Sequence, residues 1–110
     1  MPAPIFDFSV DDDGRGNALV SARGELDIGN SEQLEECLAK LAGRHATVML
    51  DLRELTFMDS TGVRVLLQTA EDARRDGWTL RMRAPADGEA LMTLQETGVL
   101  ALLPLEDQQA

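Results

Sequence analysis

The chain has 110 residues, with ten Lys or Arg against 20 Asp or Glu, so its formal net charge at pH 7 is −10. Such an acidic surface repels nucleic acid and anionic membranes, and an electrostatically attracted partner of this chain should carry a basic face. One cysteine excludes an internal disulfide and a multi-cysteine zinc site, and one histidine leaves little for other metal sites. The length predicts a single domain over residues 1–110.

The first two predicted elements are strands that form an antiparallel hairpin. Phe6, Phe8 and Val10 alternate with polar residues over residues 5–10, as in a half-buried strand. Residues 11–17 are dense in aspartate and glycine, which indicates a solvated turn. Residues 18–26 then form the second strand, and the short loop makes the pair a hairpin.

A helix is predicted to begin at residue 31. Asn30 is its expected capping residue, with Gln33 in the reciprocal position, and Gly43 is expected to end it in the left-handed conformation. We interpret His45, in the loop that follows, as solvated. Apolar side chains recur at the spacing of one buried helix face: Leu34, Cys37, Leu38 and Leu41.

Strands and helices alternate over the rest of the chain. Residues 47–52 are nearly all apolar, which is typical of a strand covered on both faces, and residues 55–58 are taken as a short connection. A helix from residue 59 to Gly77, a strand over 78–83 and a helix from Asp87 to Gly98 follow. Residues 99–105 are expected to be an edge strand or a packed tail. This order predicts an α/β fold with a mostly parallel sheet and right-handed crossovers.

The most informative segment is Asp59-Ser60-Thr61-Gly62, which follows a buried strand and opens a helix. This places the Ser60 hydroxyl at a helix N-terminus, where unpaired N–H groups and the positive end of the helix dipole tolerate an anion. Gly62 is expected to leave room for an approaching partner. Asp59 is expected to orient or deprotonate the neighbouring hydroxyl.

These residues make the chain resemble the STAS domain family, which includes bacterial anti-sigma factor antagonists and the cytoplasmic tails of sulfate transporters. The family motif is matched by Asp51-Leu52, followed by residues 57–63 with the sequence Phe-Met-Asp-Ser-Thr-Gly-Val. A second signature, Gly-Glu-Leu-Asp, is matched by residues 24–27. The resemblance implies a mixed, mostly parallel sheet of four or five strands, an N-terminal antiparallel hairpin and helices mainly on one face.

The resemblance also implies a function. In the antagonist branch, the serine after the motif aspartate, here Ser60, is phosphorylated by an anti-sigma factor that has serine kinase activity. The unphosphorylated antagonist binds that kinase and releases the sigma factor, and a PP2C-type phosphatase reverses the modification. On this basis we expect a phosphoprotein in a partner-switching system of transcription regulation, with no catalytic residue, no metal and no cofactor of its own. A monomer is the default expectation.

Each site residue also has a structural interpretation. Ser60 is equally suited to be a plain helix cap, and Thr61 is the second choice as phosphate acceptor. Asp59 and Asp27 are candidates for partner contact, but Asp59 also suits a cap and Asp27 a turn. Arg64 departs from the commonest family pattern, which often has glycine there, and is expected to pair with phosphate or contact the partner.

Two competing functions remain open. A STAS accessory subunit of an ABC-type membrane lipid transporter is the alternative to the antagonist, and it would be recovered with an ATPase rather than a kinase. A small nucleotide-binding or hydrolytic enzyme is disfavoured, because the chain lacks a glycine-rich phosphate loop and a base for the serine. We expect a cytoplasmic location without membrane insertion, since no apolar run reaches about 18 residues and the N-terminus lacks signal-peptide features.

Overall fold

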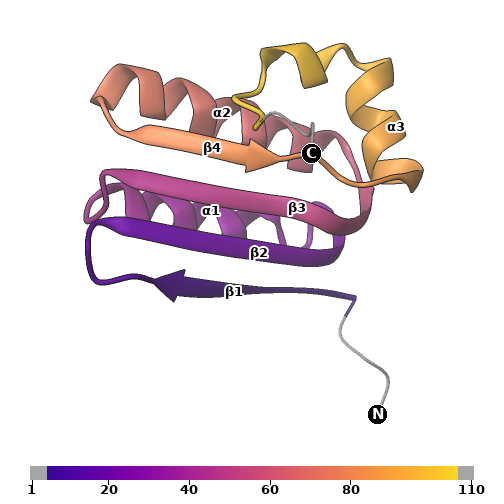
Figure 1. The fold of residues 1–110 in the computed structure, drawn as a ribbon. Coiled ribbons are helices and arrows are strands. Elements are labelled where there is room, and N and C mark those ends of the chain that lie inside the picture. The colour runs from indigo at the N-terminus through magenta and orange to yellow at the C-terminus, as the bar shows by residue number, and fades with distance from the viewer. Residues whose placement is uncertain (1–4, 107–110) are drawn as a thin grey trace.

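The chain begins with the predicted antiparallel hairpin of β1 (Phe6–Asp12) and β2 (Asn17–Leu26), in a computed structural model that describes residues 5–106 (Figure 1). The loop between the strands turns through Gly14 and Gly16, whose φ angles are 72° and 91°. Asp13 stabilises this turn because its carboxylate accepts hydrogen bonds from the backbone N–H groups of Arg15 and Asn17.

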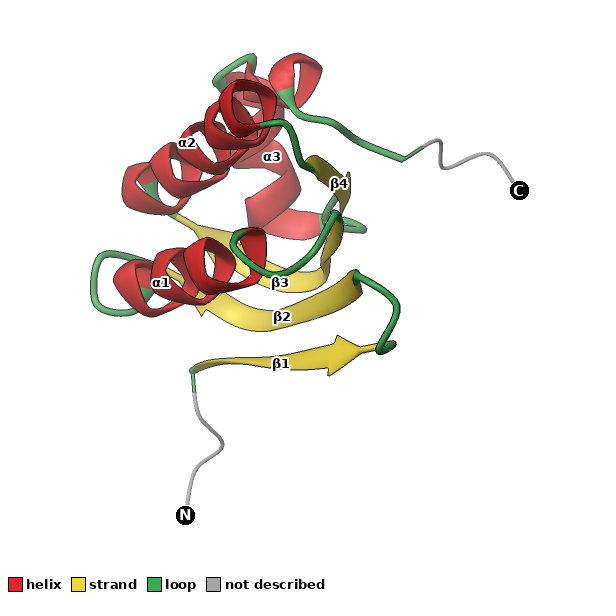
Figure 2. Cartoon of the chain, turned by 90° about the vertical axis from the view of Figure 1, so that its left-hand side faces the viewer, coloured by secondary structure: helices red, strands yellow, loops and turns green. Residues whose placement is uncertain are grey.

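Two right-handed crossovers build the rest of the sheet. Helix α1 (Ser31–Ala42) connects β2 to β3 (Thr47–Met58), and α2 (Ser60–Asp76) connects β3 to β4 (Thr79–Arg83). The strand order is β1-β2-β3-β4, with the last two pairs parallel. Because both crossovers step in the same direction across the sheet, α1 and α2 lie on the same face (Figure 2).

Strand β3 is the centre of the fold and is longer than predicted. The expected connection over residues 55–58 is part of the strand, since these residues continue the parallel pairing with β2. Val48, Leu50 and Leu52 point to the helices and are fully buried. The other face is covered less completely than predicted, because Met49 and Asp51 there are partly exposed.

Helix α3 (Gly88–Glu96) and the 3₁₀ turn η1 (Val99–Leu102) follow β4. No regular strand forms over residues 99–105, within the part of the chain that the structure describes. Instead, a single bridge pairs Leu105 with Met82 of β4, where the Met82 N–H donates to the Pro104 carbonyl at 3.0 Å. Pro104 has no N–H to donate, so the pairing cannot extend through it.

The helix ends differ in part from the predictions. Asn30 makes no capping hydrogen bond to α1, because its side chain is bound to Asp27 N–H and the Glu25 carbonyl. Gly43 ends α1 at a φ of −75° rather than in the left-handed region. Gly77 ends α2 where the sequence predicted, and it is the one of the two that adopts the left-handed conformation, with a φ of 80°. Within residues 5–106, no helix combines the length and the apolar character that crossing a membrane requires.

Candidate functional site

The two sequence signatures meet at one edge of the sheet. Leu26 and Met58 are register partners at the ends of the adjacent parallel strands β2 and β3. The backbone N–H of Asp59 donates to the Leu26 carbonyl at 3.2 Å. The loop that starts at Asp27 therefore lies beside the segment that opens α2, at the carboxyl edge where parallel α/β sheets commonly bind their ligands.

Asp59 caps α2 and holds the neighbouring loop. One carboxylate oxygen accepts hydrogen bonds from the N–H groups of Thr61 and Gly62, at 2.9 and 3.2 Å, and from the Thr61 hydroxyl. The other accepts the Ile28 N–H at 3.2 Å. Burial raises the pKa of Asp59, but these hydrogen bonds outweigh it and hold the pKa below its ordinary value of 3.8. The carboxylate is therefore an ionised anchor, and no described hydrogen bond joins it to the Ser60 hydroxyl.

Ser60 is the first residue of α2, and its side chain is exposed to solvent. The helix N-terminus around it offers fewer donors than the sequence predicted. Asp59 takes the N–H groups of Thr61 and Gly62 through its carboxylate, and that of Val63 through its carbonyl at 3.1 Å. An anion on Ser60 therefore meets solvent and side chains rather than these three backbone donors.

Thr61 and Gly62 face inward to different degrees. Thr61 is half-buried and donates its hydroxyl to Asp59, so this hydroxyl is less accessible to a partner than the exposed Ser60 hydroxyl. Gly62 is buried, and a Cβ added there would lie 2.7 Å from Cγ of Met58 and 3.0 Å from the Leu26 side chain. The expectation that Gly62 leaves room for a partner is wrong, because the missing side chain makes room for the core.

Asp27 forms the turn that the structural interpretation predicted. Its carboxylate accepts the Gly29 N–H at 2.9 Å, and its carbonyl accepts the N–H groups of Asn30 and Ser31. Ile28, which follows it, is 77% exposed at the same edge as Ser60. Sequence reasoning missed Ile28. The available signal was an isolated apolar residue within a turn-forming segment.

A groove of about 540 Å³ begins at Ser60 and follows α2 toward η1. Arg64 lies in this groove with an exposed side chain, and its Nη1 is 3.5 Å from Oε2 of Glu35 on α1. Leu102 of η1, which is 61% exposed, also lines the groove. The floor and sides are completed by Val63, Leu67, Gln68, Ala70, Glu71 and Arg74.

His45 is the residue for which the sequence interpretation fails. It is 8% exposed rather than solvated. One ring nitrogen lies 2.7 Å from the Asp12 carboxylate and the other 3.1 Å from the Leu41 carbonyl. It precedes β3, whereas Ser60 follows β3, so the two side chains lie at opposite ends of the same strand. The one histidine of the chain therefore cannot serve Ser60 as a base.

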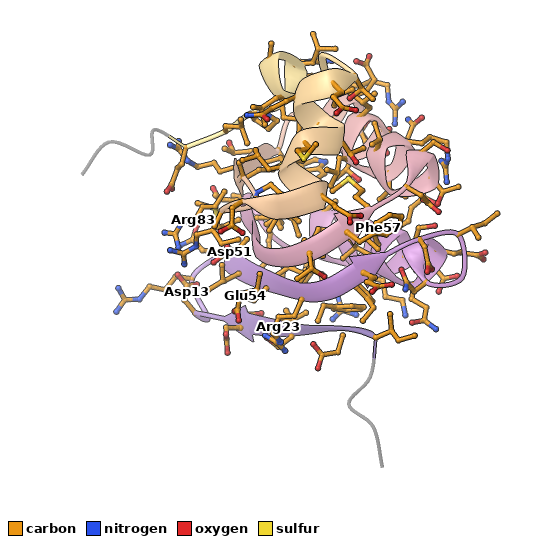
Figure 3. The ribbon with its side chains drawn as sticks, turned by 90° about the vertical axis from the view of Figure 1, so that its right-hand side faces the viewer. Asp13, Arg23, Asp51, Glu54, Phe57 and Arg83 are labelled. Carbon is orange, nitrogen blue, oxygen red and sulfur yellow. The ribbon has the colours of Figure 1, made fainter. Side chains whose placement is uncertain are left out.

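Four further arginines, Arg74, Arg75, Arg81 and Arg83, pair with acidic residues. Arg83 lies beside Asp51 at 3.7 Å (Figure 3) and donates to Glu106 at 3.2 Å. Arg74, Arg75 and Arg81 contact Glu71, Asp72, Asp76 or Glu106. Cys37 is half-buried on the apolar side of α1, and burial raises the pKa of its thiol. Among residues 5–106, no three His, Cys, Asp or Glu side chains are grouped to hold a metal ion.

Known proteins resemble this chain in sequence and in fold. The family model of the STAS domain matches residues 10–109. The chain is 32% identical over 63 residues to the anti-sigma-B factor antagonist of Bacillus subtilis, a stretch that covers 57% of this chain and 58% of that relative. It is 35% identical over 75 residues to osmosensory protein A of Mycobacterium tuberculosis, covering 66% and 47%. The chain thus spans about half the length of these curated relatives.

Solved structures show the same fold. An anti-sigma factor antagonist from Mycobacterium paratuberculosis superposes with a TM-score of 0.74 at 24% identity, covering 98% of this chain and 92% of that one. The Bacillus cell fate determinant SpoIIAA in its phosphorylated form gives a TM-score of 0.70 at 21% identity, covering 94% and 92%. The match of the family model over nearly the whole chain and the meeting of both signatures at one sheet edge lead to one conclusion: the chain belongs to the STAS domain family.

Proposed function

We propose that this chain is an anti-sigma factor antagonist that is switched off by phosphorylation of Ser60. In the unphosphorylated form it binds an anti-sigma factor with serine kinase activity and thereby releases a sigma factor, and a PP2C-type phosphatase restores that form. The observation that carries the proposal is the exposed Ser60 hydroxyl at the start of the groove along α2, at the sheet edge where Ile28 is also exposed. The likeness to the anti-sigma-B factor antagonist and to phosphorylated SpoIIAA supports it.

The physics of the site suits a phosphate switch. A phosphate adds a charge of about −1.5 to −2 at pH 7. The ionised Asp59 lies next in the chain, and it already occupies the Thr61 and Gly62 N–H groups. Burying such an anion against a partner costs several kcal/mol without a matching cation, while about 1.4 kcal/mol changes affinity tenfold. One phosphate is therefore sufficient to separate the proteins without refolding either.

In this proposal the chain is a substrate and a switch rather than an enzyme. The Asp59 carboxylate is committed to three backbone N–H groups, and His45 lies at the far end of β3. Neither group therefore activates Ser60 from within the chain. The base and the ATP site belong to the kinase partner.

Calorimetric titration against the purified anti-sigma kinase of the same organism tests the proposal. We expect Ser60→Ala to bind with the affinity of the unmodified chain with or without ATP, and Ser60→Asp to bind at least tenfold more weakly. Ser9→Asp is the matched control, because it adds the same charge at an exposed serine of β1. Equal weakening by Ser9→Asp and Ser60→Asp would show that net charge, not the site, governs binding.

A further inference from the structure

Arg64 lies one helical turn after Ser60 and on the same side of α2. Residues four apart on a helix are neighbours, and a helical side chain leans back over the preceding turn. Both side chains are exposed, and both line the groove that begins at the start of α2. The Arg64 guanidinium is therefore placed within reach of any group added to the Ser60 oxygen.

An anion on Ser60 needs a side chain to bind it, because the nearby backbone N–H groups are already hydrogen-bonded. The N–H groups of Thr61, Gly62 and Val63, which would ordinarily hold an anion at a helix start, all donate to Asp59. Arg74, the other arginine of the groove, is 14 residues away, or about 21 Å along the helix axis. Of the two cations in the groove, only Arg64 lies close to Ser60.

In the present structure, Arg64 makes a single long contact. Its Nη1 is 3.5 Å from Glu35 Oε2, and the two side chains are 58% and 34% exposed. An exposed pair of this length is weak. A phosphate dianion carries more charge than a carboxylate and accepts two parallel N–H bonds from a guanidinium, so it competes effectively for the same arginine.

We propose that Arg64 is the internal counter-ion of phosphorylated Ser60, exchanging Glu35 on α1 for the phosphate on α2. The inference rests on the proposed modification of Ser60 and extends it. The exchange stabilises the modified form and leaves Glu35 without this partner. Phosphorylation thus changes the exposed surface around Ser60 in two ways. It adds an anion to Ser60, and it engages the Arg64 cation, which in the unmodified form makes only a weak contact with Glu35.

Phosphorus NMR of the full chain tests this directly, with phosphoserine incorporated at position 60 during translation. No kinase is needed, so the result stands apart from whether an anti-sigma factor is the partner. We expect Arg64→Gln to raise the second pKa of the phosphate by about half a unit, because the arginine favours the dianion. Glu35→Gln should lower it, since the competing carboxylate is removed.

Arg74→Gln is the matched control, because it removes an equal charge from the far part of the same groove. It should leave the phosphate pKa unchanged. The side chains of Arg64, Glu35 and Arg74 are 58%, 34% and 68% exposed, so their substitution should not disturb the core. Amide spectra of each variant would verify that the fold is kept. A phosphate pKa that is unaffected by Arg64→Gln, or that shifts equally with Arg74→Gln, would overturn the proposal.

Discussion

The carboxylate of Asp59 accepts a hydrogen bond at 3.2 Å from the backbone N–H of Ile28, which lies 31 positions earlier in the chain. The same carboxylate caps α2 through Thr61 and Gly62. One side chain therefore holds together the loop after β2 and the start of α2. Ser60 opens α2 at this edge of the sheet, so the shape of the exposed surface around Ser60 depends on Asp59.

Substitution of Asp59 separates its two roles. An asparagine oxygen still accepts the Thr61 and Gly62 N–H groups, but its amide group cannot accept the Ile28 N–H. We expect faster hydrogen exchange at the Ile28 amide in Asp59→Asn with Thr61 still protected, and loss of protection at both in Asp59→Ala. The alanine variant should lose about 1–2 kcal/mol of unfolding free energy, as expected for a lost cap. Unchanged exchange at Ile28 in both variants would contradict this anchor.

Gly62→Ala tests whether this glycine serves the core. The added methyl group would lie 2.7 Å from Met58 Cγ, so we expect a loss of about 1–3 kcal/mol in urea unfolding. Gly43→Ala is the matched control, because Gly43 has a helical φ of −75° and its nearest neighbour to an added Cβ is at 3.6 Å. It should be neutral or stabilising by about 0.4–1 kcal/mol. Equal stability of the two variants would show that Gly62 is not closely packed.

His45 should make stability depend on pH. The hydrogen bonds to Asp12 and to the Leu41 carbonyl raise the pKa of His45, since both neighbours are acceptors, and they outweigh burial and Arg44, which lower it. A raised folded-state pKa gives stability that is fully present below the unfolded value of 6.5 and is lost as pH rises through the folded value. The pKa of Asp12 is lowered, mainly by the Gly14 N–H and then by His45, so its share persists down to about pH 4.

Urea unfolding of the unmodified chain and of His45→Gln measures this effect. The stability difference between the two should be larger at about pH 5.5, where the imidazolium exists in both the folded and unfolded states, than at about pH 9. Asp12→Asn should reduce the same pH dependence, because it removes the carboxylate partner. A stability difference between the two proteins that grows with rising pH would contradict an imidazolium at His45 in the folded state.

The order of elements and the position of Ser60 at a helix start could be predicted because they depend on local patterns. Alternation identified the hairpin, and a strand followed at once by a capped helix identified the position of Ser60. The family signatures identified Asp27 and Asp59 separately, and only the pairing of Leu26 with Met58 in β2 and β3 shows that they lie at the same sheet edge.

The interpretations that failed depend on contacts between distant segments. His45 is buried only because the tip of the hairpin brings Asp12 to it across 33 positions. Gly62 of α2 packs inward because the Leu26 side chain of β2 lies against it. Asn30 has suitable chemistry for a cap, but the turn at Asp27 and the Glu25 carbonyl use its side chain instead. No periodicity along the chain reports such pairings.

Capture from lysate of the native organism, supplied with ATP, tests the central role of Ser60 most directly. The bait proteins are the unmodified chain, Ser60→Ala and Ser60→Asp, with quantitative mass spectrometry of partners and phosphates. The account predicts that Ser60→Ala retains an anti-sigma factor with a kinase fold, that Ser60→Asp does not, and that phosphate on the unmodified chain maps to Ser60. Recovery of an ABC-type ATPase equally by all three, or phosphate on Thr61 with none on Ser60, would contradict it.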